Sequence, residues 1–294
     1  MVSFGCQDMV TTVRRILLKH PKDAFINQTK INNESYKLNY TSTPNFELAC
    51  NQFEDFLKLI NAFKPEVHFM SHSESSSLDS IYTHDPCIMT KNGLVLCNMG
   101  KKERRNEPKE MNEYFRSIGI PVIGQIKNPG ILEGGDIVWI DNQTVAIGEG
   151  YRSNAEGIKQ FKEILGNQVN ETISVALPHW TGPEDCLHLM SNLSPIDHKL
   201  FLVYSRLLSI PFRKYLLDHE IKLIEVPDEE YHSMGCNVLA MKRRKVIMLK
   251  GNPITQKRLE QAGVEVSTYD GSEISLKGAG GPTCLTRPFY RSDK

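Results

Sequence analysis

The chain lacks several features that mark common classes of protein. Its 35 Lys and Arg residues are balanced by 35 Asp and Glu residues, so there is no surplus of positive charge. Because binding of a polyanion needs such a surplus on some face, nucleic acid is not an expected partner. No apolar run approaches the roughly 20 residues that a membrane helix needs. Residues 1–21 contain no apolar core of a secretion signal. We therefore expect a cytoplasmic protein without a membrane partner.

Cysteine pairs with a functional spacing are also absent. The seven cysteines are scattered along the chain, and none forms a C-x-x-C pair. An odd number of cysteines that are scattered along the chain argues against a disulfide framework and agrees with a reducing compartment. His84 and Cys87 form a single H-x-x-C, which is not the ligand set of a zinc site. We expect neither a metal ion nor an organic cofactor.

What the chain does contain is a repeated arrangement of secondary structure. Hairpin-like strand pairs recur about every 45–55 residues, which is the signature of a structural repeat. Helices with one apolar face and single apolar strands follow most of them. A capping box, Ser153-x-x-Glu156, is expected to begin the second helix. The predicted strand pairs cover 86–99, 137–147, 185–204 and 238–249, the helices 106–118, 153–165 and 253–262, and the single strands 120–123, 172–177 and 264–268.

The two ends of the chain complete the pattern. A last strand at 283–290 has no helix after it, whereas a strand at 13–19, a helix at 45–63 and a strand at 66–69 have no hairpin before them. Joining the C-terminal strand to the N-terminal one gives a fifth unit. Five strand–strand–helix–strand units that close a ring form a single α/β domain over residues 1–294, with side chains converging on its axis.

Polar residues stand at equivalent places, near the start of each predicted hairpin. Cys284 follows a glycine-rich turn, and glycine lets the backbone approach a ligand closely. Glu133, Asp136 and Asp85 enter apolar strands, and His188 is predicted inside one. Each of these residues alone is commonly structural, but in a ring they would face one another across the axis. A Cys–His pair supplies a nucleophile and a proton shuttle, and several carboxylates favour a cationic substrate such as a guanidinium group.

These motifs carry a family resemblance. The sequence Leu-Glu-Gly-Gly-Asp at 132–136, the segment 151–157, His188 and Gly-Gly-Pro-Thr-Cys at 280–284 resemble the guanidine-modifying enzymes of the pentein fold, and among them the dimethylarginine dimethylaminohydrolases. The resemblance covers residues 78–288 in motif order and spacing. It implies a five-bladed α/β propeller of ββαβ units with pseudo-fivefold symmetry and no metal. It also implies hydrolysis of a substituted arginine to citrulline and an amine.

The resemblance also assigns roles to individual residues. Cys284 resembles the nucleophile that forms a covalent thiouronium, His188 the general acid and base, and Glu133 the acid that orients this histidine. Asp85 and Asp79 are implied to contact the guanidinium, and the substrate carboxylate is assigned to two arginines. The substrate-binding set is Asp79, Asp85, Arg104, Arg152 and Asp136. Arg105 is the alternative to Arg104, and a structural role within its own turn is the alternative for Asp136.

Two departures from the family pattern bear on the substrate. His84 stands where the dimethylargininases carry another acid. Met190 lies two residues after His188, where the arginine deiminases and amidinotransferases have an aspartate. An apolar residue at this position suits a methylated guanidine nitrogen better than a bare NH₂ group, so Met190 favours a dimethylargininase. The expected partner is therefore a small guanidine, with a homodimer expected from the resemblance alone. An arginine deiminase, an amidinotransferase and a non-catalytic ribosome-binding module of the same fold remain alternatives, the last opposed by the presence of Cys284, His188 and Glu133.

Overall fold

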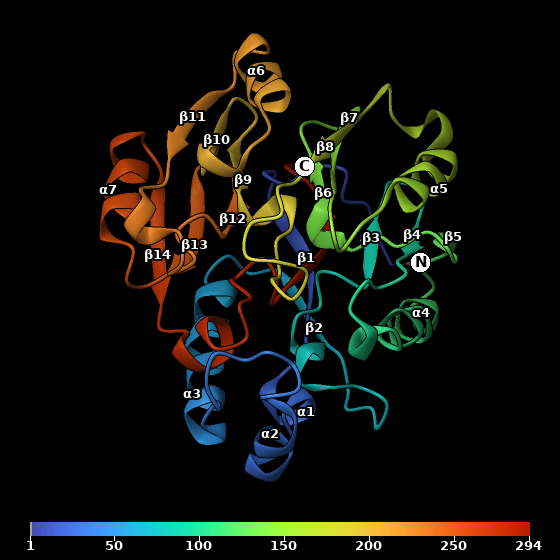
Figure 1. Ribbon diagram of the computed structural model, residues 1–294, viewed down its shortest axis with the longest axis vertical. Helices are drawn as coiled ribbons and strands as arrows, with labels where there is room; N and C mark the ends of the chain where they lie inside the picture. Colours follow the sequence, from blue (N-terminus) through green and yellow to red (C-terminus); the bar gives the residue numbers. More distant parts are fainter. Residues whose placement is uncertain (1) are drawn as a thin grey trace.

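The computed structural model describes residues 2–294 as a ring of five three-stranded sheets (Figure 1). In each sheet the middle strand pairs antiparallel with one neighbour and parallel with the other. The strands are β1 (Val13–Leu18), β2 (Glu66–Phe69), β3 (Cys87–Met89), β4 (Leu94–Leu96), β5 (Val122–Gln125), β6 (Ile137–Trp139), β7 (Thr144–Glu149), β8 (Glu171–Ala176), β9 (Leu193–Asp197), β10 (Leu200–Val203), β11 (Lys222–Glu225), β12 (Val238–Lys242), β13 (Lys245–Leu249), β14 (Glu265–Tyr269) and β15 (Arg287–Arg291).

Helices connect the parallel strands of each blade, as such crossovers require. Five of the helices, α3 to α7, occupy this place, and α1 and α2 extend the first blade. The bounds are α1 (Pro21–Ala24), α2 (Gln28–Glu34), α3 (Phe46–Asn61), α4 (Glu107–Ser117), α5 (Ala155–Leu165), α6 (Ile210–Asp218) and α7 (Pro253–Gln261). Figure 1 shows them on the outside of the ring, around the strands. The predicted pentein propeller is confirmed; α1, α2 and α6 were not foreseen.

The ring closes by pairing the two ends of the chain. Strand β1 lies between β15, antiparallel, and β2, parallel, with Ile16 opposite Pro288 on one side and Val67 on the other. This is the fifth unit expected from the sequence. Closure has a functional consequence, because Cys284 lies three residues before β15 and depends on β1 for its position.

The first blade also carries an expected site residue. Helices α1 and α2 pack against a 3₁₀ turn, η1 (Leu78–Ile81), which holds Asp79. Leu78 and Ile81 of this turn belong to the apolar core formed with α3. Asn45 caps α3, its side chain accepting a hydrogen bond from the backbone N–H of Leu48 at 2.9 Å.

One predicted hairpin was wrong in its first strand. Residues 185–191 were expected to pair with 199–204, but β9 (Leu193–Asp197) is the partner of β10. Leu189–Ser191 form a 3₁₀ turn, η5, instead of a strand. The reason is that the Leu189 N–H donates to the carboxylate of Asp136, and the Ser191 hydroxyl accepts from the His188 N–H. These bonds occupy backbone donors that a strand would use for pairing.

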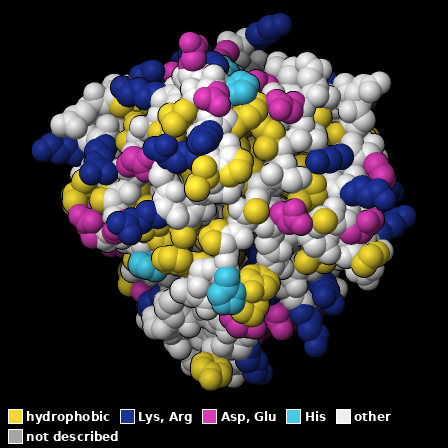
Figure 2. All heavy atoms as spheres, turned by 45° about the horizontal axis from the view of Figure 1, so that its top comes forward, with side chains coloured by type: hydrophobic (Ala, Val, Ile, Leu, Met, Phe, Trp, Pro, Cys, Tyr) yellow, Lys and Arg dark blue, Asp and Glu magenta, His cyan; other side chains and the backbone are white. Residues whose placement is uncertain are grey.

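The surface shows no region of one charge sign on the face drawn in Figure 2, where basic and acidic side chains are interspersed. This distribution agrees with the formal net charge of zero. Within residues 2–294, no helix has both the length and the apolar character needed to cross a membrane.

The start of α5 differs from the predicted capping box. Asn154, not Ser153, is the N-cap: its Oδ1 accepts from the Gly157 N–H at 2.8 Å and from the Ile131 N–H at 3.0 Å. Its Nδ2 donates to the Pro129 carbonyl at 2.9 Å. The side chain therefore joins the helix to the chain that leads into the Glu133 motif.

We predict that Asn154→Ala lowers the free energy of unfolding by about 1–2 kcal/mol, because it removes a helix cap and two further backbone contacts. Urea denaturation followed by circular dichroism measures this loss. The control is Asn142→Ala, at an exposed position in the turn between β6 and β7. Equal stability of the two variants would contradict the assignment.

Candidate active site

Four residues from different blades meet at one end of the ring axis. Asp85, Glu133, His188 and Cys284 each lie just before the first strand of their blade, namely β3, β6, β9 and β15. One ligand atom from each of Asp85, Glu133 and His188 lies within 4.8 Å of the others. Cys284 lines one cavity with His188 and a second cavity with Asp85. The fold thus brings together the residues that the sequence placed at equivalent points of the repeat.

Glu133 is the centre of a buried hydrogen-bond cluster. Its Oε2 accepts from His188 Nε2 at 2.8 Å and from Arg152 Nη1 at 3.0 Å. Its Oε1 accepts from the backbone N–H groups of Gly100 at 2.9 Å and Lys101 at 3.2 Å. Because the side chain is fully buried, these contacts replace all of its hydration.

The charges of the cluster are mutually dependent. Burial opposes ionisation of Glu133, but Arg152 and His188 outweigh it, so the pKa of Glu133 lies well below its usual range. Burial also opposes the charged form of His188, yet Cys186 and Asp136 outweigh it and raise the pKa of His188 well above its usual value. The raised pKa favours the imidazolium form of His188, in which Nε2 donates to Glu133 and Nδ1 faces Cys186 Sγ at 3.7 Å.

Arg104 has partners other than the expected substrate carboxylate. Its Nη1 lies 2.6 Å from Asp85 Oδ2, its Nη2 donates to the Tyr82 carbonyl at 2.8 Å, and its Nε donates to Glu107 Oε1 at 3.0 Å. Burial raises the pKa of Asp85, but Arg104 more than offsets this and keeps the carboxylate ionised. These contacts hold Arg104 against Asp85, but Arg104 also lines a cavity with Arg152 and Cys284, so its contact with a substrate carboxylate stays a prediction. Arg105, the alternative, is exposed.

Asp136 does not face a ligand. Its Oδ1 accepts from the Leu189 N–H at 2.9 Å and its Oδ2 from the Ser153 hydroxyl at 2.5 Å. The residue is fully buried, and burial raises its pKa to about 6. These contacts agree with the structural role that the sequence offered as the alternative for Asp136, although the donors come from Leu189 and Ser153 and not from its own turn. It positions His188 by fixing the turn that follows this histidine.

One of the two cavities at Cys284, which we name the charged cavity, contains most of the ionised groups. Asp79, Asp85, Lys101, Arg152 and Cys284 are among its lining residues. Lys101 Nζ lies 2.6 Å from Asp79 Oδ2, so this acid is already paired. Arg152 donates from Nη1 to Glu133 Oε2 and also lines this cavity.

The other cavity, which we name the aromatic cavity, lies on the His188 side of Cys284. Its lining includes Trp180, Tyr231, His232 and Leu276 together with His188. It has a free volume of about 230 Å³, compared with about 160 Å³ for the charged cavity. Thr41, Asp185, Cys186, Ala279 and Cys284 line both cavities and mark their junction.

Two thiols at this junction differ in their ionisation. Asn237 Nδ2 donates to Cys284 Sγ at 3.3 Å, but burial raises the pKa of Cys284 to about 12. Cys186 Sγ lies 3.7 Å from His188 Nδ1. Burial raises the pKa of Cys186, but His188 and Arg152 outweigh it and lower the pKa below its usual value. Sequence reasoning missed Cys186 and Asn237; the signal for Cys186 was its place two residues before His188.

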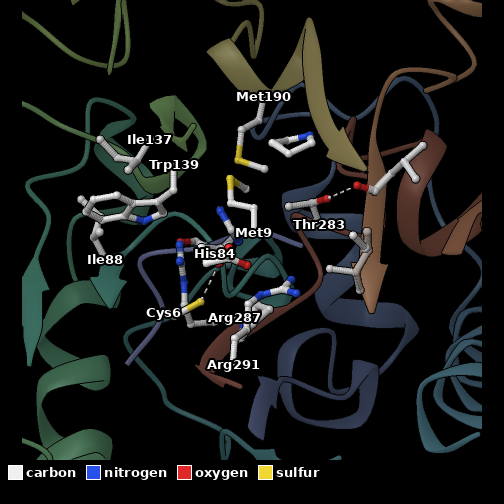
Figure 3. Close-up of a pocket in the computed structure, with 16 residues that line it drawn as sticks. Cys6, Met9, His84, Ile88, Ile137, Trp139, Met190, Thr283, Arg287 and Arg291 are labelled. Atoms are coloured by element: carbon white, nitrogen blue, oxygen red, sulfur yellow. Dashed lines mark hydrogen bonds between the residues drawn. The ribbon is translucent and has the colours of Figure 1, made fainter. Parts of the chain in front are cut away.

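The two departures from the family pattern lie behind the site. His84 and Met190 line a separate cavity along the ring axis with Trp139 and Arg287, as Figure 3 shows. His84 is buried and neutral, because burial and Arg287 lower its pKa to about 3. Since Met190 points into this cavity, its apolar character gives no evidence about the substituents on a substrate nitrogen.

Asp85, Glu133 and His188 present three ligand atoms of types that bind metal ions. Both carboxylates are already paired with guanidinium groups, those of Arg104 and Arg152, and His188 is protonated. A divalent ion would have to displace these positive charges. The donor set therefore does not fit a resident metal ion.

Comparison with known proteins places this geometry in a family. A sequence model of the family described as "N,N dimethylarginine dimethylhydrolase, eukaryotic" matches residues 20–291. A dimethylarginine dimethylaminohydrolase of Pseudomonas aeruginosa is 26% identical over 246 residues, which are 84% of this chain and 90% of that protein. An arginine deiminase of Oenococcus oeni is 27% identical over 251 residues, covering 72% of this chain and 60% of that protein.

Solved structures agree in fold. The Pseudomonas aeruginosa dimethylarginine dimethylaminohydrolase, as a mutant complexed with citrulline, matches 95% of this chain and 100% of its own, with a TM-score of 0.77 and 24% identity. The N-terminal domain of ArgZ, covalently bound to a reaction intermediate, matches 94% of this chain and 98% of its own, with a TM-score of 0.78 and 20% identity.

The ring of five blades and these structural matches define a pentein fold. The chain belongs to the eukaryotic N,N-dimethylarginine dimethylhydrolase family, whose model matches it over nearly its whole length. It is therefore a hydrolase of carbon–nitrogen bonds in guanidino groups.

In the free enzyme we predict that iodoacetamide alkylates Cys186 at least about tenfold faster than Cys284, because one pKa unit changes the thiolate fraction tenfold. Mass spectrometry of the two peptides, at pH 7 and pH 9, measures the rates. Cys50, a half-exposed thiol on α3 whose pKa is raised by burial, is the control in the same chain. Faster labelling of Cys284 would contradict the charge assignment.

Proposed function

We propose that the protein hydrolyses Nω-methylated arginine to citrulline and methylamine or dimethylamine. The observation that carries the proposal is the meeting of Cys284, the His188–Glu133 pair and ionised Asp85 at one junction. A thiol and an imidazolium are the nucleophile and acid that displacement of an amine requires. Asp85 supplies the negative charge that a guanidinium needs, and Arg152 has N–H groups left for the carboxylate of an amino acid.

Substrate charge starts the reaction. With its pKa near 12, the Cys284 thiol is protonated in the free enzyme. A guanidinium bound against Asp85 favours the thiolate, and the thiol proton is released. Sγ then attacks the guanidinium carbon, forming a C–S bond and a tetrahedral adduct.

His188 provides the proton for departure of the amine. Nε2 is held by Glu133, so Nδ1, which in the free enzyme faces Cys186 Sγ, gives its proton to the leaving nitrogen as the C–N bond breaks. This leaves a thiouronium on Cys284. Neutral His188 next takes a proton from water, the hydroxide adds to the same carbon, and cleavage of the C–S bond releases citrulline. Each such proton transfer contributes roughly 10²–10⁴ in rate.

Arginine itself is the second candidate substrate. Met190 faces the axial cavity and not Cys284, so it does not select against an unsubstituted guanidine. A panel of arginine, Nω-methylarginine and asymmetric Nω,Nω-dimethylarginine, with citrulline and the amines quantified, distinguishes the two. Release of ammonia from arginine at the higher kcat/KM would favour the deiminase reaction.

Replacement of Cys284 by Ala is expected to abolish citrulline release while thermal stability and binding of the substrate are retained, because only the attacking sulfur is removed. Activity and binding by calorimetry are the measurements, with Cys50→Ala as the control. Residual activity above a few per cent of wild type would exclude covalent catalysis by Cys284.

Truncation of Arg152 to Ala should lower kcat/KM for a methylated arginine by about tenfold to a hundredfold, as loss of a charge-assisted contact worth about 1.5–3 kcal/mol requires. The decarboxylated analogue of the same substrate should lose less, since it has no anion to bind. Arg105→Ala, at an exposed position, is the matched control. Equal losses on both substrates would mean that Arg152 acts only through Glu133.

A further inference from the structure

The two cavities at Cys284 have different chemical roles. Arg152, Asp79 and Asp85 line the charged cavity, whereas His188 lines the aromatic cavity. In the proposed reaction the amino acid part of the substrate lies with Arg152, and the group protonated by His188 departs. Because the proton donor belongs to the aromatic cavity, the departing amine leaves on that side of Cys284.

The aromatic cavity has a preformed wall. The rings of Trp180 and His232 are stacked at 6.0 Å and 22°, and Trp180 meets Tyr231 edge-on at 5.9 Å and 87°. Tyr231 stacks in turn on Tyr204 at 4.1 Å and donates from its hydroxyl to Asn192 Oδ1 at 2.8 Å. The wall is therefore held from behind and does not depend on a ligand for its shape.

Trp180 is held in an unfavourable backbone conformation at this position. Its φ is 48°, in the left-handed region that a bulky side chain rarely adopts. The indole is nevertheless 37% exposed and lines the cavity. Strain that presents an apolar ring to a cavity indicates a binding role, because burial of the ring does not account for it.

The size of the cavity exceeds what methyl groups need. Its free volume is about 230 Å³. A protein cavity of about 150 Å³ with apolar walls accommodates benzene. The aromatic cavity therefore has more free volume than a cavity that accommodates a benzene ring.

We propose that the aromatic cavity receives the substituent of the departing amine, so that the enzyme hydrolyses arginines whose Nω-substituent is a larger alkyl or aralkyl group. This inference rests on the proposed function. For Nω-benzylarginine, water adds to the guanidine carbon, the C–N bond to the benzylamine nitrogen breaks, and citrulline and benzylamine are the products. Stacking on the ring of Trp180 and apolar contact with Leu276 would hold the benzyl group.

The test is a matrix of substrates and variants. Wild type, Trp180→Ala and Trp180→Phe are assayed on the Nω-methyl, Nω-propyl and Nω-benzyl arginines, with citrulline and each amine quantified by mass spectrometry. Tyr36→Ala is the control, since Tyr36 is 90% exposed and is not among the residues that line either cavity. We expect kcat/KM for the benzyl compound to lie within about tenfold of the methyl compound in wild type. In Trp180→Ala, loss of the aromatic contact should lower the ratio of kcat/KM for the benzyl compound to kcat/KM for the methyl compound by about threefold to tenfold. In Trp180→Phe, most of the wild-type ratio should be retained.

The outcomes separate this inference from the proposed function. Hydrolysis of methylarginine without hydrolysis of the propyl and benzyl compounds would overturn the inference and leave the function standing. An equal loss on all three substrates in Trp180→Ala would also overturn it, because the ring would then support the fold and not the leaving group. Failure of wild type on every methylated and substituted arginine would instead overturn the proposed function.

Discussion

The paired burial of Glu133 is the constraint on which the site depends. A carboxylate without access to water is stable only if its charge is matched and its oxygens are bonded. Here His188, Arg152 and two backbone N–H groups together meet that requirement. Removing one partner from a buried ion pair costs about 3–5 kcal/mol. The cluster therefore holds His188 in one orientation, with the nitrogen that faces the junction fixed.

A second cluster of buried, mutually paired charges lies beside the first. Arg104 lies between Asp85 and Glu107, and all three side chains are buried. Burial raises the pKa of Glu107 to about 7 even with Arg104 beside it. Arg104 contacts Oδ2 of Asp85 and keeps this carboxylate ionised, while Oδ1 of Asp85 accepts from the Gly135 N–H at 3.1 Å. These buried charges lie at the site, whereas the five apolar clusters of the core are each formed between two neighbouring blades.

The ring explains why residues so far apart in sequence share one site. In each blade a loop leads into the first strand. Because the five blades are arranged as a ring, these loops lie at the same end of its axis. Closure by β1 and β15 completes the ring, so the position of Cys284 depends on both ends of the chain. A thiol kept protonated by burial, next to an imidazolium, remains poorly nucleophilic until a cation arrives.

The sequence by itself determined the repeat, its closure and the residue types at the blade entrances, because periodicity and glycine motifs are local properties. It did not determine side-chain direction. In a strand, His188 and Met190 would share a face. In the 3₁₀ turn that forms, with three residues per turn, they diverge, and Met190 points into the axial cavity. Tertiary structure alone likewise decided three contacts: that of Arg104 with Asp85, that of Asp136 with the Leu189 N–H, and that of Cys186 with His188. Each of them depends on the position of a second side chain or backbone group that supplies the opposite charge or the hydrogen-bond donor.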